Sequence, residues 1–166
     1  MSHVDTILEQ WQRERPDLDV APMGLTGRLK RIARHLSREM EPVFASHGLT
    51  LAGFDVLATL RRSGAPYRMS PGELMDNTMV TSGTMTHRID LLVKDGHVER
   101  IKNPDDGRSV LIALTGKGLR LIDRAVTDHV RNLHRLTGGL DARDAAALDE
   151  LLSRFLATLE SDDRPA

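Results

Sequence analysis

The sequence predicts a mainly α-helical fold with one small β-hairpin. Apolar residues recur every three or four positions in several long segments, which is the spacing of an amphipathic helix. Two short runs, 98–102 and 109–114, instead flank the turn sequence Asn103-Pro104-Asp105-Asp106-Gly107. The second run alternates apolar residues, as a half-buried strand does, so these two runs are expected to pair as the hairpin.

Composition limits the class of protein. The chain has 166 residues, enough for one domain with a real core, and its content of 40% hydrophobic and 28% charged residues is typical of a folded globular chain. Cysteine is absent, which excludes disulfides and thiolate metal sites. No apolar run reaches the ~20 residues that span a bilayer, and no secretory signal is visible, so we expect a cytoplasmic location and no membrane partner. The formal net charge of -1 argues mildly against nucleic-acid binding, so any basic surface must be local.

Two helices are expected first. A short N-terminal helix covers 4–15, where apolar residues have helical spacing, and Pro16 ends it. A long helix follows, with Thr26 as its candidate N-cap and Gly48 as its end. Pro42 lies inside this pattern, so we expect it to kink the helix or to begin a new segment.

The middle of the chain shows strong helix boundaries. Thr50 is expected to cap a third helix, and Ser70-Pro71-Gly72-Glu73 combines a capping hydroxyl, a proline in the first turn and a glutamate three residues after the serine. That helix is short because 77–80 has the composition of a turn. Thr81 opens the next helix, which Asp95-Gly96 closes. The hairpin comes next, followed by two long helices.

A short helix, a tight turn, a second helix and a hairpin form a winged helix-turn-helix. The major groove of B-DNA admits one α-helix, and the hairpin can reach an adjacent groove. The N-terminal end of the second helix carries small polar and basic side chains that suit phosphates and base edges. Arg108, at the hairpin tip, can enter a narrow minor groove. The candidate DNA-contacting residues are Ser70, Thr81, Ser82, Thr84, Thr86, His87, Arg88, Lys102, Arg108 and Ser109.

A purely structural interpretation stays open at this point. Thr and Ser after a turn are ordinary helix caps, and Arg108 can be a solvated loop charge. Over 81–110, five basic residues are balanced by five acidic ones, so the segment has no net charge. Pattern and charge alone therefore do not decide between a DNA reader and another helical module.

The hairpin sequence resembles the wing of the MarR family of transcriptional regulators. That motif is an Asp, any residue and an Arg, followed by an apolar strand ending in Leu-Thr, and it matches Asp106-Gly107-Arg108 through Leu114-Thr115. The segment 81–92 is also similar to the DNA-reading helix of this family. The resemblance implies a homodimer, held by the first and last helices, that binds a pseudo-palindromic operator as a repressor. On this basis we divide the chain into an extension helix and linker (1–24), a dimerisation helix (25–48), a DNA-binding lobe (49–115) and C-terminal dimerisation helices (116–166).

Further segments resemble the urate-responsive branch of the family, which has regulators of the PecS, HucR and TamR type. The matching segments are 14–19, 54–62 and 79–82, and this branch has an extra N-terminal helix. The resemblance implies a ligand site at Trp11, Asp55, Arg88 and Arg100. A guanidinium can bind planar, anionic urate in a bidentate way, and an indole can stack on it. A carboxylate repels the anion, so Asp55 is expected to act as a switch or to hold an Arg.

Each ligand-site residue also has a structural interpretation. Trp11 can anchor the extension, Asp55 can pair with an Arg, Arg88 can contact a phosphate, and Arg100 can be a wing charge. Within the regulator hypothesis, a phenolic or polycarboxylate metabolite is the alternative ligand. From other classes, a small enzyme lacks support, because no nucleophile elbow, phosphate loop or metal-ligand spacing is present, and a non-DNA interaction module is the remaining alternative. We therefore expect no catalytic residues, no cofactor and no metal site.

Overall fold

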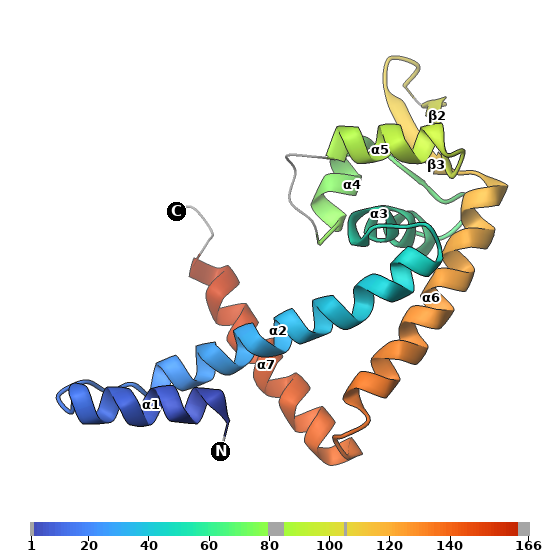
Figure 1. The fold of residues 1–166 in the computed structure, drawn as a ribbon. Helices are drawn as coiled ribbons and strands as arrows, with labels where there is room; N and C mark the ends of the chain where they lie inside the picture. The colour runs from blue at the N-terminus through green and yellow to red at the C-terminus, as the bar shows by residue number, and fades with distance from the viewer. Residues whose placement is uncertain (1, 80–84, 105, 163–166) are drawn as a thin grey trace.

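The computed structural model describes residues 2–79, 85–104 and 106–162 (Figure 1). It confirms a mainly helical fold in which a small lobe is joined to long helices that extend away from it. The helices are α1 (His3–Glu14), α2 (Ala21–Ser46), α3 (Leu51–Arg62), α4 (Pro71–Asn77), α5 (Met85–Lys94), α6 (Gly116–Thr137) and α7 (Ala142–Asp162), and the strands are β1 (Arg68–Met69), β2 (Val98–Lys102) and β3 (Val110–Leu114).

The sheet is larger than the predicted hairpin. β2 and β3 pair antiparallel as expected, but β1 adds a strand on the other side of β3, so the order is β1-β3-β2. The sequence analysis missed β1 because two residues are too short to show an alternating pattern. The expected second strand also begins one residue later, at Val110, because the Ser109 hydroxyl donates to the Asp106 carbonyl and belongs to the turn.

The extension helix α1 packs on the N-terminal part of α2, at the end of α2 that is far from the lobe (Figure 1). Ser2 and Asp5 cap α1 reciprocally, as a capping box. Val4 is buried in this contact, and a Cβ on Gly24 would lie 2.9 Å from the Leu8 Cδ1 atom. Asp5 also forms an ion pair with Arg28 of α2. Close packing and this ion pair therefore fix α1 to α2.

The start of the long helix was misplaced, and one of the two outcomes expected at Pro42 is excluded. α2 begins at Ala21, whose N–H donates to the Asp19 carboxylate at 3.0 Å. Thr26 is therefore inside the helix, where its hydroxyl donates to the Pro22 carbonyl at 3.0 Å and caps nothing. The helix also continues through Pro42 to Ser46, so no new segment begins at the proline. The carbonyl that Pro42 leaves without a helical partner belongs to Arg38, an exposed residue, so water can reach it.

The lobe has one apolar core, and α3 passes through it. Thr50 caps α3, as predicted, by accepting from the Gly53 N–H at 3.1 Å. Apolar side chains of α3 meet those of α4, α5, the sheet and α6 in this core, and their burial removes apolar area from water at about 25 cal/mol per Å². The largest fully buried side chains are Phe44, Leu57, Leu60, Leu74, Ile112, Ile122, Val56, Val98 and Thr59.

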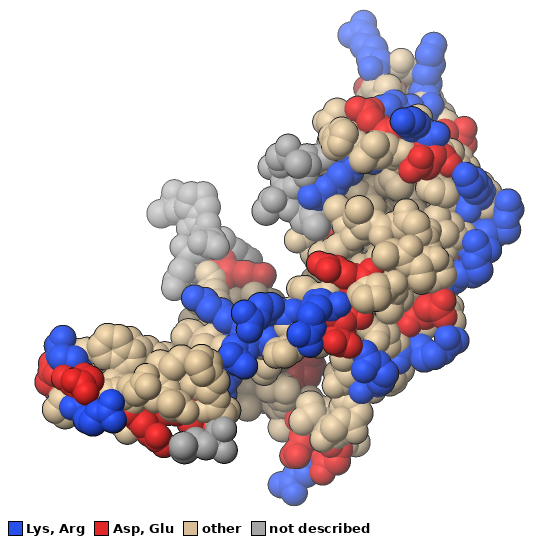
Figure 2. Space-filling model, in the orientation of Figure 1, with Lys and Arg blue, Asp and Glu red and all other residues tan. Residues whose placement is uncertain are grey.

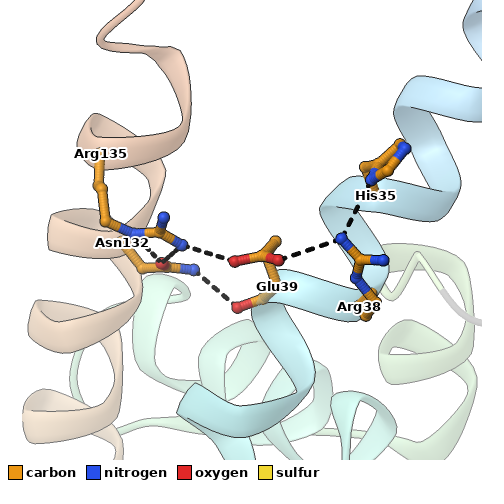
Figure 3. Close-up of polar contacts among 5 residues, drawn as sticks. All are labelled: His35, Arg38, Glu39, Asn132 and Arg135. Atoms are coloured by element: carbon orange, nitrogen blue, oxygen red, sulfur yellow. Dashed lines mark hydrogen bonds and ion pairs between the residues drawn. The ribbon is translucent and has the colours of Figure 1, made fainter.

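Polar contacts join α2 to α6 outside the lobe (Figure 3). The Glu39 carboxylate accepts from Arg135 at 2.8 Å and from Arg38 at 3.4 Å, and its main-chain carbonyl accepts from the Asn132 amide at 3.0 Å. The hydrogen bond from the Arg135 guanidinium lowers the pKa of Glu39 below its ordinary value, and the positive charges of Arg135 and Arg38 lower this pKa further. These contacts fix the angle at which the two long helices leave the lobe.

The first turn of α6 binds the turn that ends α5. The Thr115 hydroxyl donates to the Gly96 carbonyl at 2.8 Å, the Thr115 N–H donates to the His97 carbonyl at 3.1 Å, and the Lys117 ammonium donates to the Asp95 carbonyl at 2.7 Å. Gly118 lies so close that a Cβ there would be 1.9 Å from the His97 oxygen. We call Thr115, Lys117 and Gly118 the α6 clamp, because they hold three consecutive carbonyls of the α5–β2 turn.

The last helix, α7, is exposed along its length. Asp141 begins it, as predicted, by accepting from the Asp144 N–H at 2.8 Å. Its large apolar side chains remain 36% to 56% exposed, namely Leu148, Leu151, Leu152, Phe155, Leu156 and Leu159. Within the described residues, no single helix is long and apolar enough to cross a membrane, although α2 and α3, bent by 75°, pass that test on length and composition when joined.

Candidate nucleic-acid interface and ligand site

The short helix α4 is set by its first residues. Ser70 accepts from the Glu73 N–H at 3.2 Å, and the Glu73 carboxylate accepts from the Ser70 N–H at 2.8 Å, which is the capping box that the sequence predicts. Hydrogen bonding from Ser70 lowers the pKa of Glu73. The Ser70 hydroxyl, predicted as a DNA contact, therefore already has a structural partner within the chain.

The second helix of the pair, α5, turns one face to the core and the other to solvent. Met85, Ile89 and Leu92 are buried at helical spacing. That arrangement leaves Thr86 and His87 exposed near the N-terminal end of α5. The other predicted contacts at the start of this helix, Thr81, Ser82 and Thr84, lie outside the described residues.

The wing between β2 and β3 is held by its own polar groups. Asn103 donates its N–H to the Ser109 carbonyl at 3.0 Å and its side-chain amide to the Ser109 hydroxyl at 3.0 Å. The Asp106 carboxylate accepts from the Arg108 N–H at 3.1 Å. Ser109 is thus a turn residue, while the side chains of Lys102 and Arg108 are exposed and have no polar partner among the described residues. Figure 2 shows Lys and Arg side chains projecting from this end of the molecule.

The side chain of Asp55, a predicted ligand residue, forms a hydrogen bond with the main chain. It is 8% exposed on α3, and its Oδ2 atom accepts from the Met79 N–H at 2.8 Å. Met79 lies in the connection between α4 and α5. No arginine among the described residues pairs with this carboxylate, so its observed role is to hold the backbone at Met79, ahead of α5.

Arg88 lines a small cavity beneath α5. The cavity has a volume of about 90 Å³ and lies between the α2–α3 turn and α5, where Thr50, Gly53 and Asp95 are among its other lining residues. The Arg88 Nη1 atom is buried and has no hydrogen-bond partner among the described residues. A buried guanidinium nitrogen without an acceptor is unfavourable, so the cavity offers a donor to an anion or a carbonyl. The sequence analysis named Arg88 but missed Thr50 and Asp95 as neighbours, because no motif joins them.

Arg100 and Trp11 lie away from that cavity. Arg100 forms an ion pair with Asp90 of α5 at 2.6 Å, which ties β2 to the reader helix. Trp11 is 40% exposed on α1, where it lines a shallow hollow with Gln10 and Glu14. No described hydrogen bond or ion pair joins any two of Trp11, Asp55, Arg88 and Arg100. The last three belong to α3, α5 and β2 of the lobe, whereas Trp11 belongs to α1, which packs on the end of α2 that is far from the lobe (Figure 1).

Among the described residues, no group of three or more His, Asp and Glu side chains is placed so that it could hold a metal ion. His129 packs against the rings of Phe44 and Phe54, which also contact each other. Its ring centroid lies 5.1 Å from that of Phe44 and 5.0 Å from that of Phe54.

The chain is similar to known regulators. The family model described as "MarR family" matches residues 47–109. The HTH-type transcriptional regulator PecS of Dickeya dadantii (strain 3937) is 40% identical over 151 residues, which cover 91% of this chain and 91% of PecS. The multiple antibiotic resistance protein MarR of Escherichia coli (strain K12) is 36% identical over 139 residues, which cover 83% of this chain and 93% of MarR.

Solved structures agree with these matches. A mutant MarR from E. coli, complexed with operator DNA, superposes with a TM-score of 0.70 at 28% identity, over 88% of this chain and 97% of that chain. A putative MarR-like regulator from Bacillus cereus has the same fold, with a TM-score of 0.75 at 23% identity, over 85% of this chain and 99% of that chain. These relatives are transcriptional regulators rather than enzymes, which confirms the corresponding prediction. The chain therefore belongs to the MarR family of winged helix-turn-helix transcriptional regulators, in its PecS-like branch.

Proposed function

We propose that this protein is a repressor that binds a pseudo-palindromic operator as a homodimer and is released by a small anionic ligand such as urate. The observation that carries the DNA-binding part is the pair of exposed side chains, Thr86 and His87, near the start of α5, together with the exposed wing arginine, Arg108. The complex of the related E. coli MarR with operator DNA supports the same use of this fold. Two reader helices about 34 Å apart would enter successive major grooves, and such a regulator acts in the cytoplasm.

The apolar surface between α2 and α7 supports the homodimer. Leu25, Leu29 and Ile32 of α2 face Leu151 and Phe155 of α7 across an open groove. A helix with so much exposed apolar area is unfavourable in water, and a second copy would cover it.

The cavity beneath α5 supports release by an anion. Its volume of about 90 Å³ is smaller than the roughly 300 Å³ at which ligand pockets begin, so a ligand such as urate fits only if α5 moves away from the α2–α3 turn. Movement of α5 changes the position of the DNA-reading face. A ligand that binds the displaced state more tightly shifts the protein toward that state, to an extent limited by its difference in affinity for the two states. Linkage then requires that the ligand weaken DNA binding by the same factor by which DNA weakens ligand binding.

Trp11 joins this site only through the partner subunit. It lies at the far end of α2 from its own lobe, so it cannot approach Arg88 of the same chain without α1 leaving α2 (Figure 1). In a dimer formed through α2 and α7, we expect α1 of one protomer to extend toward the lobe of the other. The ligand set that the family resemblance implies is then divided between two chains.

Operator binding and urate response are tested in one titration. The promoter DNA beside the protein's own gene is bound at fixed salt, urate is added, and DNA affinity and Trp11 fluorescence are followed. We expect wild-type affinity to fall as urate saturates, while Arg88→Met binds DNA but no longer responds. Arg108→Ala should bind less tightly, with a shallower salt dependence. Unchanged DNA affinity and fluorescence at saturating urate would rule out urate.

Another ligand would leave the regulator itself intact. A phenolic or polycarboxylate metabolite could also satisfy the unpaired Arg88 nitrogen, because a phenolic oxygen can accept a hydrogen bond and a carboxylate is an anionic acceptor. Thermal-shift screening distinguishes them from urate, since a compound that binds only the folded state raises the melting temperature.

A further inference from the structure

We propose that the solvent face of α2 is a second DNA-binding surface, which contacts the phosphates of the duplex that lies between the two half-sites. The surface consists of Lys30, Arg31 and Arg34 and is called the α2 basic stripe. This inference rests on the proposed DNA-binding function and adds a contact that neither the reader helix nor the wing supplies.

The reader helix and wing supply little net positive charge for contacts with DNA phosphates. Their segment has no net charge, and Arg100 is already neutralised by Asp90. Phosphate neutralisation nevertheless supplies most of the non-specific affinity of proteins for DNA. A regulator with a net charge of -1 therefore needs a local basic surface elsewhere.

α2 carries that surface. Over Ala21–Ser46 there are five Lys and Arg residues against two Glu residues, a local charge of +3. Two of the cations are paired, Arg28 with Asp5 and Arg38 with Glu39. Lys30, Arg31 and Arg34 have no hydrogen-bond or ion-pair partner among the described residues, so their charges are available to an outside anion.

The stripe stays accessible in the proposed dimer. Helical periodicity places Lys30 and Arg34 on the opposite side of α2 from Leu25, Leu29 and Ile32, which line the apolar groove. Lys30 and Arg34 are exposed and Arg31 is half-buried. Figure 2 shows Lys and Arg side chains gathered over the middle of α2, on the same side of the molecule as α5 in Figure 1. One face of α2 therefore suits the partner subunit, and the other suits a polyanion.

Duplex DNA fits this surface better than an acidic protein does. The α2 of each protomer runs from the proposed dimer region to the lobe, so two stripes would lie between the two reader helices. A duplex held by both lobes must pass between them, whereas an acidic protein would compete with DNA for the same space. The contact is expected to be independent of sequence, because it involves phosphates alone.

The test compares two triple-alanine variants with the same change in net charge. Lys30, Arg31 and Arg34 are replaced in one, and the exposed Arg120, Arg124 and Arg143 of α6 and α7 are replaced in the other. The affinity for the promoter DNA is measured at several KCl concentrations, and dimer mass and thermal midpoint verify that both variants fold. We expect the stripe variant alone to have a shallower plot of log affinity against log salt, by about 0.9 for each phosphate that the protein no longer neutralises.

A second DNA probe locates the contact. On a short duplex that holds one half-site, the stripe variant should bind like the wild type, because the central DNA is missing. Equal effects of the two variants, or no change in slope for the stripe variant on the full operator, would overturn the inference and leave the surface to another partner. If the wild type does not bind the promoter DNA at all, the proposed function itself fails.

Discussion

At the scale of single residues, Asp55 shows how a predicted ligand group acts through the backbone. Repulsion of an anionic ligand by a carboxylate indicated a switch or an arginine partner, and in the structure the carboxylate accepts from the Met79 N–H. The sequence could not show this contact because the two residues are 24 positions apart and belong to different elements. Any force that moves Asp55 is thus passed to the connection before α5.

Replacing Asp55 tests this anchoring role. Asp55→Ala removes the acceptor and should cost about 1–2 kcal/mol of unfolding free energy, together with a severalfold loss of operator affinity. Asp55→Asn keeps an oxygen acceptor of the same shape and should retain most of both. Urea denaturation and DNA titration measure the two effects, and an Ala variant equal to the Asn variant would contradict the anchor.

His129 makes stability depend on pH. Burial lowers the pKa of this imidazole below its ordinary value of 6.5, and its Nδ1 atom has no partner among the described residues. The unfolded chain regains the ordinary pKa, so it binds more protons than the folded chain between the two pKa values. The contribution of His129 is therefore complete above pH 6.5 and is lost as the pH falls toward the folded pKa.

A ring without a titrating nitrogen should reduce that loss. We expect His129→Phe to lose less stability than the wild type between pH 7.5 and pH 5.5, as measured by urea midpoints. Some pH dependence remains, because burial and then the Lys117 charge also lower the pKa of His97. His3→Gln, at an exposed position of α1, is the control and should follow the wild type.

At the scale of elements, two backbone contacts from different parts of the chain flank α5 in the sequence. Asp55 of α3 holds the connection before α5, and the α6 clamp holds the turn after it. The positive Lys117 ammonium also lies at the C-terminal end of α5, where the helix dipole favours a cation. A rotation of α6 is therefore expected to carry the end of α5 with it.

At Gly118, the contact between α6 and the α5–β2 turn leaves no room for a side chain. Gly118→Ala would place a Cβ 1.9 Å from the His97 carbonyl oxygen, so the carbonyl must move. We therefore expect the unfolding free energy to fall by about 1–3 kcal/mol and operator binding to weaken. Gly116→Ala is the matched control, because its Cβ would meet only the tip of Arg120 at 3.5 Å. Thermal melts of both variants check this, and equal midpoints would show that the close approach is unimportant.

Sequence patterns predicted those elements whose signals are local. The Ser70 capping box, the Thr50 cap and the start of α7 at Asp141 depend on residues three apart, and all three were confirmed. The start of α2 was misplaced, because Thr26 has the composition of a cap while Asp19 supplies the acceptor. β1 was missed, because its two residues become a strand only by pairing with Ala113 and Ile112.

At the scale of the whole molecule, the site depends on contacts that no local pattern records. The Arg100–Asp90 pair and the Arg88 cavity join separate elements, so the sequence could name the arginines but not their surroundings. The separation of Trp11 from the lobe follows from the direction of α2 (Figure 1). A resemblance gives a set of residues, and only the fold shows whether one chain can assemble them.

The groove between α2 and α7 gives a prediction about assembly. Leu151 is 56% exposed in the single chain and lines this groove. Leu151→Glu would bury a charge in the proposed dimer, so we expect dissociation to monomers and loss of operator binding. Sedimentation analysis reports the mass, and Glu150→Gln, beside it on α7, should remain dimeric. A dimeric Leu151→Glu protein would place the interface elsewhere.

The apolar face of α7 and the reading face of α5 lie in separate parts of the chain (Figure 1). A chain that cannot read DNA can therefore keep its full capacity to pair. If such a chain is made in the same cell as the normal one, the proposed homodimer predicts mixed dimers that have only one working lobe. Alleles that damage α5 or the wing are expected to be dominant, whereas alleles that damage α7 are expected to be recessive. The inheritance pattern of loss-of-function alleles would thus map the two surfaces without any structural measurement.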